Sequence, residues 1–335
     1  MNDSVPSPQA AGEDISSPPR PAVSIIVPTY NTSNYIGETL ASVMAQTFQD
    51  FEIIVVNDGS PDTEELERAL VPYRARFTYI VQHNQGLSAA RNTGIAAARA
   101  DLVALLDSDD AWEPRYLERQ LEELHRENLA VVYANATTFG DRLRSGRLFM
   151  DVHPSHGPVT IESLVSQQCN VMVSVLARRD VLLAVGLFDE SLRSSEDFDM
   201  WLRVVNGGWR IGYHRQPLVR YRLRNGSLSA DGVSMCEHIL RVFDKATREL
   251  TLTERERSMI ASQRGRFAAV LRLHQGKRAF FAGDHERAAA LLAEANDQLC
   301  RPKLSIAVML MRFMPGLLLR AYDLRDRLVF GASTR

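Results

Sequence analysis

The sequence predicts an α/β protein in which a mainly parallel, Rossmann-like sheet is followed by a C-terminal helical extension. Between Val23 and Leu106, short β-branched apolar runs alternate with amphipathic segments, which is the pattern of parallel strands joined by crossover helices. From about Val233 onward, the whole chain has a helical pattern. These two observations give the fold class.

Length and charge restrict the function classes. The 335 residues suffice for one large domain and a smaller appendage, and the net charge of -2 gives no bulk attraction to nucleic acid, so no nucleic-acid partner is expected. The three cysteines are far apart and indicate reduced thiols of a cytoplasmic protein. Residues 1–22 have no secretory signal and are expected to form a disordered leader. No apolar run reaches the ~18 residues of a membrane-spanning helix.

Four strands are expected in the first third of the chain: Val23–Val27, which Pro28 should end, Phe51–Val56, Phe77–Val81 and Leu102–Leu106. Helices are expected over 36–44 and 88–99. Beyond Val131 the pattern is irregular, with strand-like runs at 171–176 and 218–223 and a helix from about Glu196. A boundary near Ala230 divides the chain into the leader 1–22, an α/β domain over 23–230 and a helical region over 231–335.

Polar residues follow each of the predicted strands. Ligands bind beyond the carboxyl ends of parallel strands. We therefore expect the residues around Thr29, Asp58, Asn84 and Asp107 to meet in one crevice.

The strongest local signal is the run Asp107-Ser108-Asp109-Asp110 after a predicted buried strand. Three carboxylates repel one another, and Mg²⁺ or Mn²⁺ bound to a diphosphate would neutralise them. The alternative is a solvated turn that caps a helix beginning near Pro114. A phosphatase of the haloacid dehalogenase type is disfavoured, because its second aspartate is followed by a small residue and threonine, whereas this sequence continues with Asp110-Ala111.

Two further segments are compatible with a nucleotide. Asp58 can accept hydrogen bonds from a ribose or a base, and Gly59 permits close approach; the alternative is an ordinary Asx turn. Arg91 follows the small residues that open a predicted helix, and its forked guanidinium can reach base or phosphate oxygens; the alternative is an exposed surface arginine.

Together these motifs resemble glycosyltransferase family 2, over roughly Val23 to Leu223. The resemblance is carried by Val23-Ser24-Ile25-Ile26-Val27-Pro28-Thr29-Tyr30-Asn31, Val56-Asn57-Asp58-Gly59-Ser60, Asn84-x-Gly86 with Ala90-Arg91-Asn92, and Leu106-Asp107-Ser108-Asp109-Asp110, in the family's order and at its spacing. It implies the nucleotide-diphospho-sugar transferase fold called GT-A, an inverting mechanism and a divalent metal, Mg²⁺ or Mn²⁺.

The resemblance also implies roles for single residues. Pro28 and Thr29 would line the nucleoside pocket, Asp58 and Arg91 would hold the base, and Asp107 would contact the ribose. Asn84 and Gly86 would complete the donor side, and Asp109 would bind the metal.

Ser195-Glu196-Asp197 resembles the family's Glu-Asp motif at a helix start. Inversion at the anomeric carbon needs a base that deprotonates the acceptor hydroxyl, and by resemblance Asp197 is that base, with Glu196 beside it on the acceptor side. The alternative is helix capping by Ser195 and acidic first-turn residues. Trp201 either stacks on an acceptor sugar or belongs to the core. The Gln-x-x-Arg-Trp motif of processive polymerases is absent after Asp197, which favours transfer of one sugar per binding event.

The resemblance predicts a nucleotide-diphospho-sugar donor, a carbohydrate or lipid-linked acceptor, and a role in surface-polysaccharide assembly. A nucleotidyltransferase would favour a glycine-rich basic loop where Pro28-Thr29-Tyr30-Asn31 stands, and a sugar-nucleotide-binding scaffold without turnover would not need Asp107, Asp109 and Asp197.

Residues 301–335 are apolar and carry seven Arg or Lys against two Asp, a balance of +5. They would either lie peripherally on the inner face of the cytoplasmic membrane or pack on protein.

Overall fold

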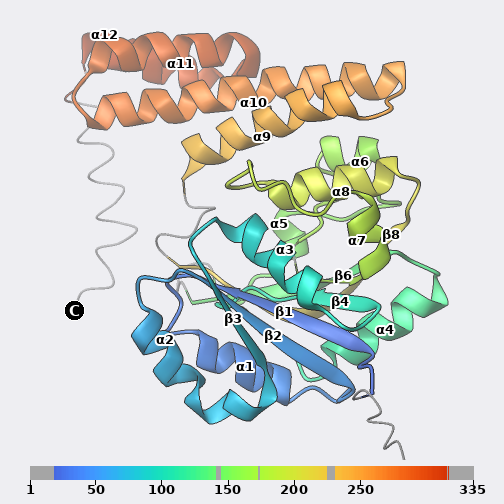
Figure 1. The fold of residues 1–335 in the computed structure, drawn as a ribbon. Coiled ribbons are helices and arrows are strands. Elements are labelled where there is room, and N and C mark those ends of the chain that lie inside the picture. The colour runs from blue at the N-terminus through green and yellow to red at the C-terminus, as the bar shows by residue number, and fades with distance from the viewer. Residues whose placement is uncertain (1–18, 141–144, 173, 225–230, 315, 317–335) are drawn as a thin grey trace, which may run out of the picture.

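The computed structural model describes residues 19–140, 145–172, 174–224, 231–314 and 316 (Figure 1). Most of the expected leader therefore lies outside the described residues. The same holds for the expected boundary at Ala230 and for most of the C-terminal segment after Met314.

Eight strands form one sheet in the order β3-β2-β1-β4-β7-β6-β8-β5. Their bounds are β1 (Val23–Thr29), β2 (Phe51–Asp58), β3 (Thr78–Gln82), β4 (Leu102–Leu105), β5 (Ala111–Trp112), β6 (Val131–Phe139), β7 (Val175–Arg178) and β8 (Ile211–Arg222). The helices of the α/β domain are α1 (Ile36–Met44), α2 (Thr63–Leu70), the 3-10 helix η1 (Val71–Arg76), α3 (Leu87–Ala97), α4 (Tyr116–Arg126), α5 (Phe149–Val152), α6 (Ile161–Val165), α7 (Arg179–Ala184) and α8 (Glu196–Asn206).

The first four strands are parallel and create the site edge. β1 pairs with both β2 and β4, and β2 pairs with β3, all in parallel. The chain first moves outward, from β1 to β2 to β3, and then returns to β4 on the other side of β1. Right-handed crossovers consequently place α1 and α2 on one face of the sheet and α3 on the other, as Figure 1 shows. The order reverses between β1 and β4, so a crevice opens beyond their carboxyl ends.

Pro28 does not end β1, contrary to our expectation. The Leu106 N–H donates to the Ile26 carbonyl oxygen at 3.1 Å, so the backbone groups of Ile26 face β4. Residues two apart on a strand face the same neighbour, and Pro28 therefore also faces β4. Because β4 ends at Leu105, the missing N–H of Pro28 costs no ladder hydrogen bond.

The second half of the sheet is mixed, and part of it was not expected. β7 is antiparallel to β4 and to β6, and β5 is antiparallel to β8. β6 lies where an irregular segment was predicted; it pairs on both sides, and its first six residues are all buried, so it lacks the alternation that marks a half-exposed strand. The strand predicted at 171–176 is β7, shifted to Val175–Arg178.

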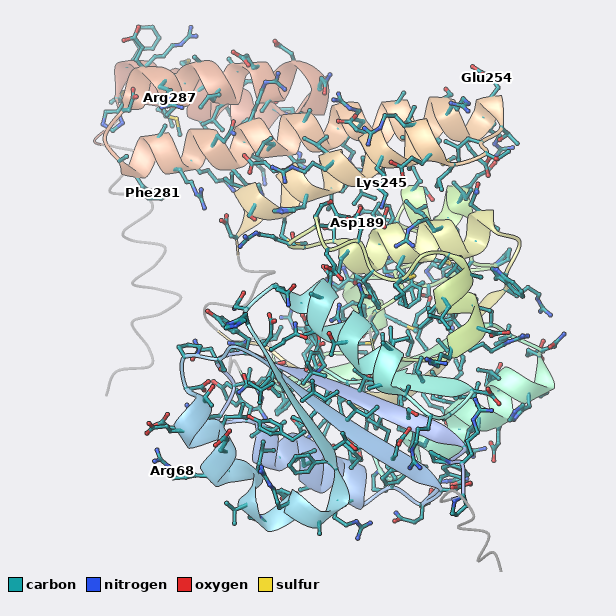
Figure 2. All side chains as sticks on the ribbon, in the orientation of Figure 1. Arg68, Asp189, Lys245, Glu254, Phe281 and Arg287 are labelled. Carbon is teal, nitrogen blue, oxygen red and sulfur yellow. The ribbon has the colours of Figure 1, made fainter. Side chains whose placement is uncertain are left out.

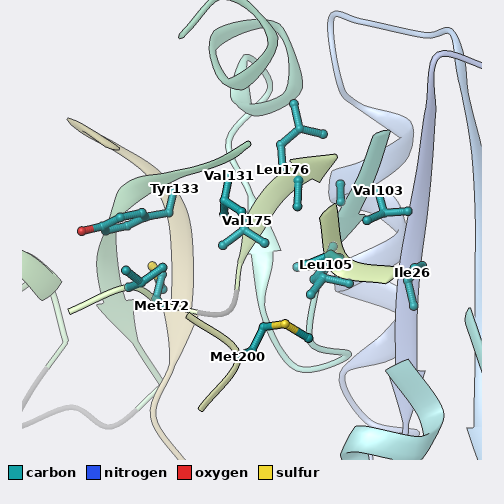
Figure 3. Close-up of a cluster of buried hydrophobic side chains, with 14 of the residues drawn as sticks. Ile26, Val103, Leu105, Val131, Tyr133, Met172, Val175, Leu176 and Met200 are labelled. Carbon is teal, nitrogen blue, oxygen red and sulfur yellow. The ribbon is translucent and has the colours of Figure 1, made fainter. Parts of the chain in front are cut away.

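The main hydrophobic core lies along this sheet. Figure 3 shows Ile26, Val103 and Leu105 of the parallel half close to Val175, Leu176 and Val131 of the mixed half, with Met200 of α8 beneath them. All seven side chains are buried. This continuous core fixes α8 relative to the carboxyl ends of β1 and β4.

The C-terminal region is helical, as predicted: α9 (Gly232–Glu249), α10 (Glu254–Phe281), α11 (His285–Leu299) and α12 (Pro302–Phe313). Figure 1 shows α9 and α10 lying over α6 and α8. Lys245 of α9 pairs with Asp189, which Figure 2 shows on the facing loop, and with Asp199 of α8 at 3.1 Å. A second, small core joins α10, α11 and α12 through Phe280, Ala288, Ala289, Leu292 and Met311. Among the described residues, no helix has both the length and the apolar content needed to cross a bilayer.

Candidate functional site

A cavity of about 750 Å³ lies beyond the carboxyl ends of β1, β2 and β4. It brings together the sequence-predicted residues Pro28, Thr29, Asp58, Asn84, Gly86, Asp107, Asp109, Glu196, Asp197 and Trp201. These residues come from segments as far apart as 28 and 201 in the chain. The parallel topology explains the convergence of the residues up to Asp109, because each parallel strand brings the residues at its carboxyl end to the same edge, whereas Glu196, Asp197 and Trp201 come from α8.

On one side of the cavity, Asp58 organises the turn between β3 and α3. Its carboxylate accepts the backbone N–H of Gln85 at 3.0 Å and of Gly86 at 2.8 Å. Gly59 has a φ of +63°, and a Cβ there would meet the backbone nitrogen of Asn84 at 2.7 Å, so this position requires glycine. The Asx turn expected as the alternative is made by Asn57, whose side-chain oxygen accepts the Ser60 N–H. A contact between Asp58 and a nucleoside stays a prediction.

The acidic run holds three carboxylates in different environments. Asp107 accepts a hydrogen bond from Arg91 at 2.8 Å, and Asp109 forms an ion pair with Arg224. Asp110 is buried and accepts the backbone N–H of Arg222 at 2.8 Å. Burial first, and then the negative charge of its neighbours, raises the pKa of Asp109 and raises that of Asp110 well above its usual range. The run therefore brings three carboxyl groups together at the cavity, two of which pair with an arginine.

Asp197 is the second residue of α8 and lines the same cavity. Burial, followed by the charge of Glu196, raises its pKa to about 7, although Arg91 acts in the opposite direction. A carboxyl group with this pKa is matched to proton transfer near neutral pH. Ser195, the expected alternative cap of this helix, has a φ of +58° and makes no side-chain capping hydrogen bond.

Arg91 lies beside the cavity instead of lining it. Its side chain is 1% exposed and is enclosed between Asp107 and Glu196. It is therefore not the exposed surface arginine of the alternative interpretation. Trp201 lines the cavity but is itself 1% exposed and packs edge-on against Phe188, so most of it belongs to the core.

Several cavity residues were not identified from the sequence. Arg222 is the last residue of β8 and Arg224 follows it; they contact the acidic run through the Asp109 carbonyl oxygen and the Asp109 carboxylate respectively. The sequence did contain a signal for these two residues, because arginine recurs at every second position from Arg220 to Arg224. The helical region adds an apolar wall, which no sequence signal indicated: Met235, Ile239, Phe243 and Phe267. An edge-on contact joins this wall to Phe198, the residue after Asp197, with ring centroids 5.8 Å apart.

Sequence relatives point to one family. Residues 24–174 match the model described as glycosyl transferase family 2. The chain is 27% identical over 243 residues to an uncharacterized glycosyltransferase of Rickettsia typhi, covering 70% of this chain and 74% of the relative. A longer glycosyltransferase of Rickettsia bellii is 30% identical over 195 residues, and the match spans 55% of this chain and 27% of that protein.

Solved structures share the fold. TarS from S. aureus in complex with UDP-GlcNAc has a TM-score of 0.58 at 18% identity, covering 87% of each chain. The mannosyltransferase PcManGT from Pyrobaculum calidifontis, in complex with GDP-Man and Mn²⁺, has a TM-score of 0.59 at 19% identity, covering 91% of this chain and 88% of its own. The protein is therefore a glycosyltransferase of the GT-A fold, in which residues 24–174 match the family 2 model.

Proposed function

We propose that the protein is an inverting, non-processive transferase. It moves a hexosyl or N-acetylhexosaminyl group from a nucleotide-diphospho-sugar to a hydroxyl of a carbohydrate or lipid-linked acceptor, in surface-polysaccharide assembly. The observation that carries this proposal is the placement of Asp197, with a pKa raised to about 7, in the same cavity as the carboxylates of Asp107 and Asp109.

The donor side is the crevice between β1 and β4. Pro28, Thr29 and Asp58 would enclose the nucleoside, with Asn84 and Gly86 at the opening of α3. The complexes of TarS with UDP-GlcNAc and of PcManGT with GDP-Man support a nucleotide-sugar donor on this fold.

A hard divalent cation fits the acidic run. Among the described residues, no three His, Cys, Asp or Glu side chains form a ready metal site. One or two carboxylates are nevertheless the usual protein share of a Mg²⁺ site that is completed by substrate phosphates. Asp109 would hold Mg²⁺ or Mn²⁺ with Asp107 beside it, and the repulsion between these two carboxylates favours a cation there. Such a cation neutralises negative charge on a departing diphosphate.

The acceptor side begins at Asp197. Its carboxylate would take the proton of the acceptor hydroxyl while the acceptor oxygen forms a bond to the anomeric carbon. The bond from that carbon to the diphosphate oxygen breaks, and the nucleoside diphosphate leaves with its electron pair. Attack from the face opposite to the leaving group inverts the anomeric configuration. Glu196 lies beside the base, and Trp201 contributes one edge of the acceptor site.

The apolar wall and α12 support a lipid-linked acceptor. Met235, Ile239 and Phe267 are only partly buried where they face the cavity, which suits an apolar group attached to the accepting sugar. Ile306 and Phe313 of α12 are 55% and 78% exposed, beside basic residues. We infer that the segment from Arg301 to Arg335 attaches the protein peripherally to the inner face of the cytoplasmic membrane.

The test is a donor panel. Nucleotide sugars are screened by thermal shift with Mn²⁺ present, and a donor at ~100 times its dissociation constant should stabilise the fold by about 2.7 kcal/mol. Hydrolysis of the selected donor is then measured in the wild type and in Asp197→Ala. Failure of every donor to stabilise the protein would contradict the proposal. Donor binding without any turnover that depends on Asp197 would favour the alternative, a sugar-nucleotide-binding scaffold.

A further inference from the structure

Arg91 connects three elements that are distant in the sequence. It extends from α3, donates from Nη1 to Glu196 Oε1 of α8 at 2.6 Å, and donates from Nη2 to Asp107 Oδ1 after β4 at 2.8 Å. Its guanidinium also lies over the ring of Phe188, 5.3 Å from the centroid. The side chain is 1% exposed and does not line the cavity, so it has no open path to a bound nucleotide.

Other contacts at the beginning of α8 hold Phe198 and Asp199, which pack against Phe243 and pair with Lys245, whereas Arg91 holds Glu196 itself. The preceding residue, Ser195, is in the left-handed region and makes no side-chain capping bond. Glu196 and Asp197 are the first two residues of the helix. Glu196, whose side chain is 7% exposed, is fixed by Arg91, and any displacement of Glu196 would also displace Asp197.

We propose that Arg91 is a positioning residue, which sets the base Asp197 at a fixed distance from the donor-side carboxylate Asp107. The two arms of its planar guanidinium reach Asp107 after β4 and Glu196, the residue before Asp197. A lysine in the same place has one charged nitrogen instead of a rigid fork, so it would not reproduce the two separate bonds from Nη1 and Nη2. This inference rests on the proposed function and departs from the nucleotide contact that family resemblance implies for Arg91.

The bridge formed by Arg91 between Asp107 and Glu196 also affects the pKa of Asp197. Arg91 from α3 favours the ionised form of Asp197, whereas Glu196 on α8 and Asp107 after β4 oppose it. Asp109, Arg193 and Arg224 face the same cavity. Removing the charge of Arg91 should therefore raise the pKa of Asp197 and move the acid limb of the pH–rate profile to higher pH.

The experiment compares Arg91→Lys, Arg91→Met and the control Lys245→Met. Lys245 also ties α8 to another element, through Asp199, but it does not line the cavity or act on Asp197. For each folded protein, we would measure kcat with the selected donor, the pH–rate profile, and the affinity for UDP or GDP with Mn²⁺ by calorimetry.

Arg91→Lys should lower kcat by about 10²-fold, the effect of a misplacement of about 1 Å, with a much smaller loss of nucleotide affinity and an unchanged acid limb. Arg91→Met should lower kcat further and shift the acid limb upward. Lys245→Met should change neither. The intermediate activity of Arg91→Lys is the partial rescue expected when the charge is kept and the two-armed reach is lost.

Two results would overturn the inference. If Arg91→Lys keeps the wild-type kcat, the two bonds from Arg91 to Asp107 and Glu196 are not needed to position Asp197. If nucleotide affinity and kcat fall by the same factor, Arg91 contacts the donor instead. If Arg91→Met fails to fold, Arg91→Lys decides alone. Turnover by the wild type is measured first. An inactive wild type would contradict the proposed function, whereas the results above test the role of Arg91.

Discussion

Charged side chains are buried at the carboxyl edge of the parallel sheet, whereas the ion pairs within the C-terminal helical region lie on the surface. At the sheet edge, Arg91 and Glu196 are buried as an ion pair. In the helical region, ion pairs such as Arg264–Asp244 and Arg272–Glu294 lie on the surface. Surface pairs contribute little to stability, whereas buried charges are costly unless they are paired. Buried charge is therefore concentrated in the part of the molecule where we place the chemistry.

The two regions meet at α8. Lys245 of α9 pairs with Asp199, two residues after Asp197, and Phe243 packs against Phe198. The helical region thus supports the back of the helix that carries the proposed base and contributes the apolar wall of the cavity. Four predictions test how far this division of roles extends.

The largest effect is expected for Asp197→Asn. The change removes the proton acceptor with little change in shape, so turnover should fall by roughly 10²–10⁴-fold while donor binding survives. Steady-state kinetics and donor titration measure the two quantities, with Asp180→Asn on the surface of α7 as the matched control. A comparable loss of donor affinity would make Asp197 a binding or folding residue.

Asp109→Ala should weaken Mn²⁺-dependent donor affinity by about tenfold or more, which is about 1.4 kcal/mol. The physical reason is the loss of the carboxylate that would share the cation with the diphosphate. Calorimetry with and without Mn²⁺ checks this, and Asp101→Ala is the control, because that carboxylate lies far out on the surface. Unchanged metal dependence would exclude Asp109 as the metal ligand.

Asp197→Asn should also stabilise the protein at high pH. The folded-state pKa of about 7 lies above the ordinary value of 3.8, so between these values the folded state binds more protons than the unfolded state. Wild-type stability therefore falls as pH rises through this window, by up to ~1.4 kcal/mol per pH unit. Asparagine has no such dependence. Denaturant unfolding at pH 4 and pH 8 should show an advantage of the variant at pH 8 only, and equal differences at both values would contradict the elevated pKa.

The smallest effect concerns α12. Replacing Ile306 and Phe313 together by serine should reduce flotation with anionic liposomes, because buried methylene groups contribute about 0.8 kcal/mol each to such binding. The wild type should float less at high salt, since each basic residue near the surface contributes about 1 kcal/mol. Phe281→Ser is the control, because this residue of α10 is 62% exposed, a fraction between those of Ile306 and Phe313. Identical flotation of all three proteins would make α12 a packing surface.

The sequence by itself determined the parallel half of the fold and which residues lie at its carboxyl edge. β1, β2 and β4 are buried apolar runs followed at once by polar residues, and parallel strands bring their ends to one edge. The residues that follow such strands can therefore be assigned to one crevice from local patterns alone. The helical C-terminal region was equally readable, because its caps are local: Asp231 and Asp284 accept backbone N–H groups of the helices that they begin.

Only the tertiary structure decided the rest. β6 lacks an alternating pattern because strands flank it on both sides. The two-armed contact of Arg91 joins residues 16 and 105 positions away, and the apolar wall comes from helices beyond the family 2 domain. Such contacts depend on how elements pack, and no local preference encodes the partner of a buried charge. Asp197 shows the same difference. A short motif suffices to select this residue from the sequence, but its raised pKa arises from burial and from charges that other segments bring to it.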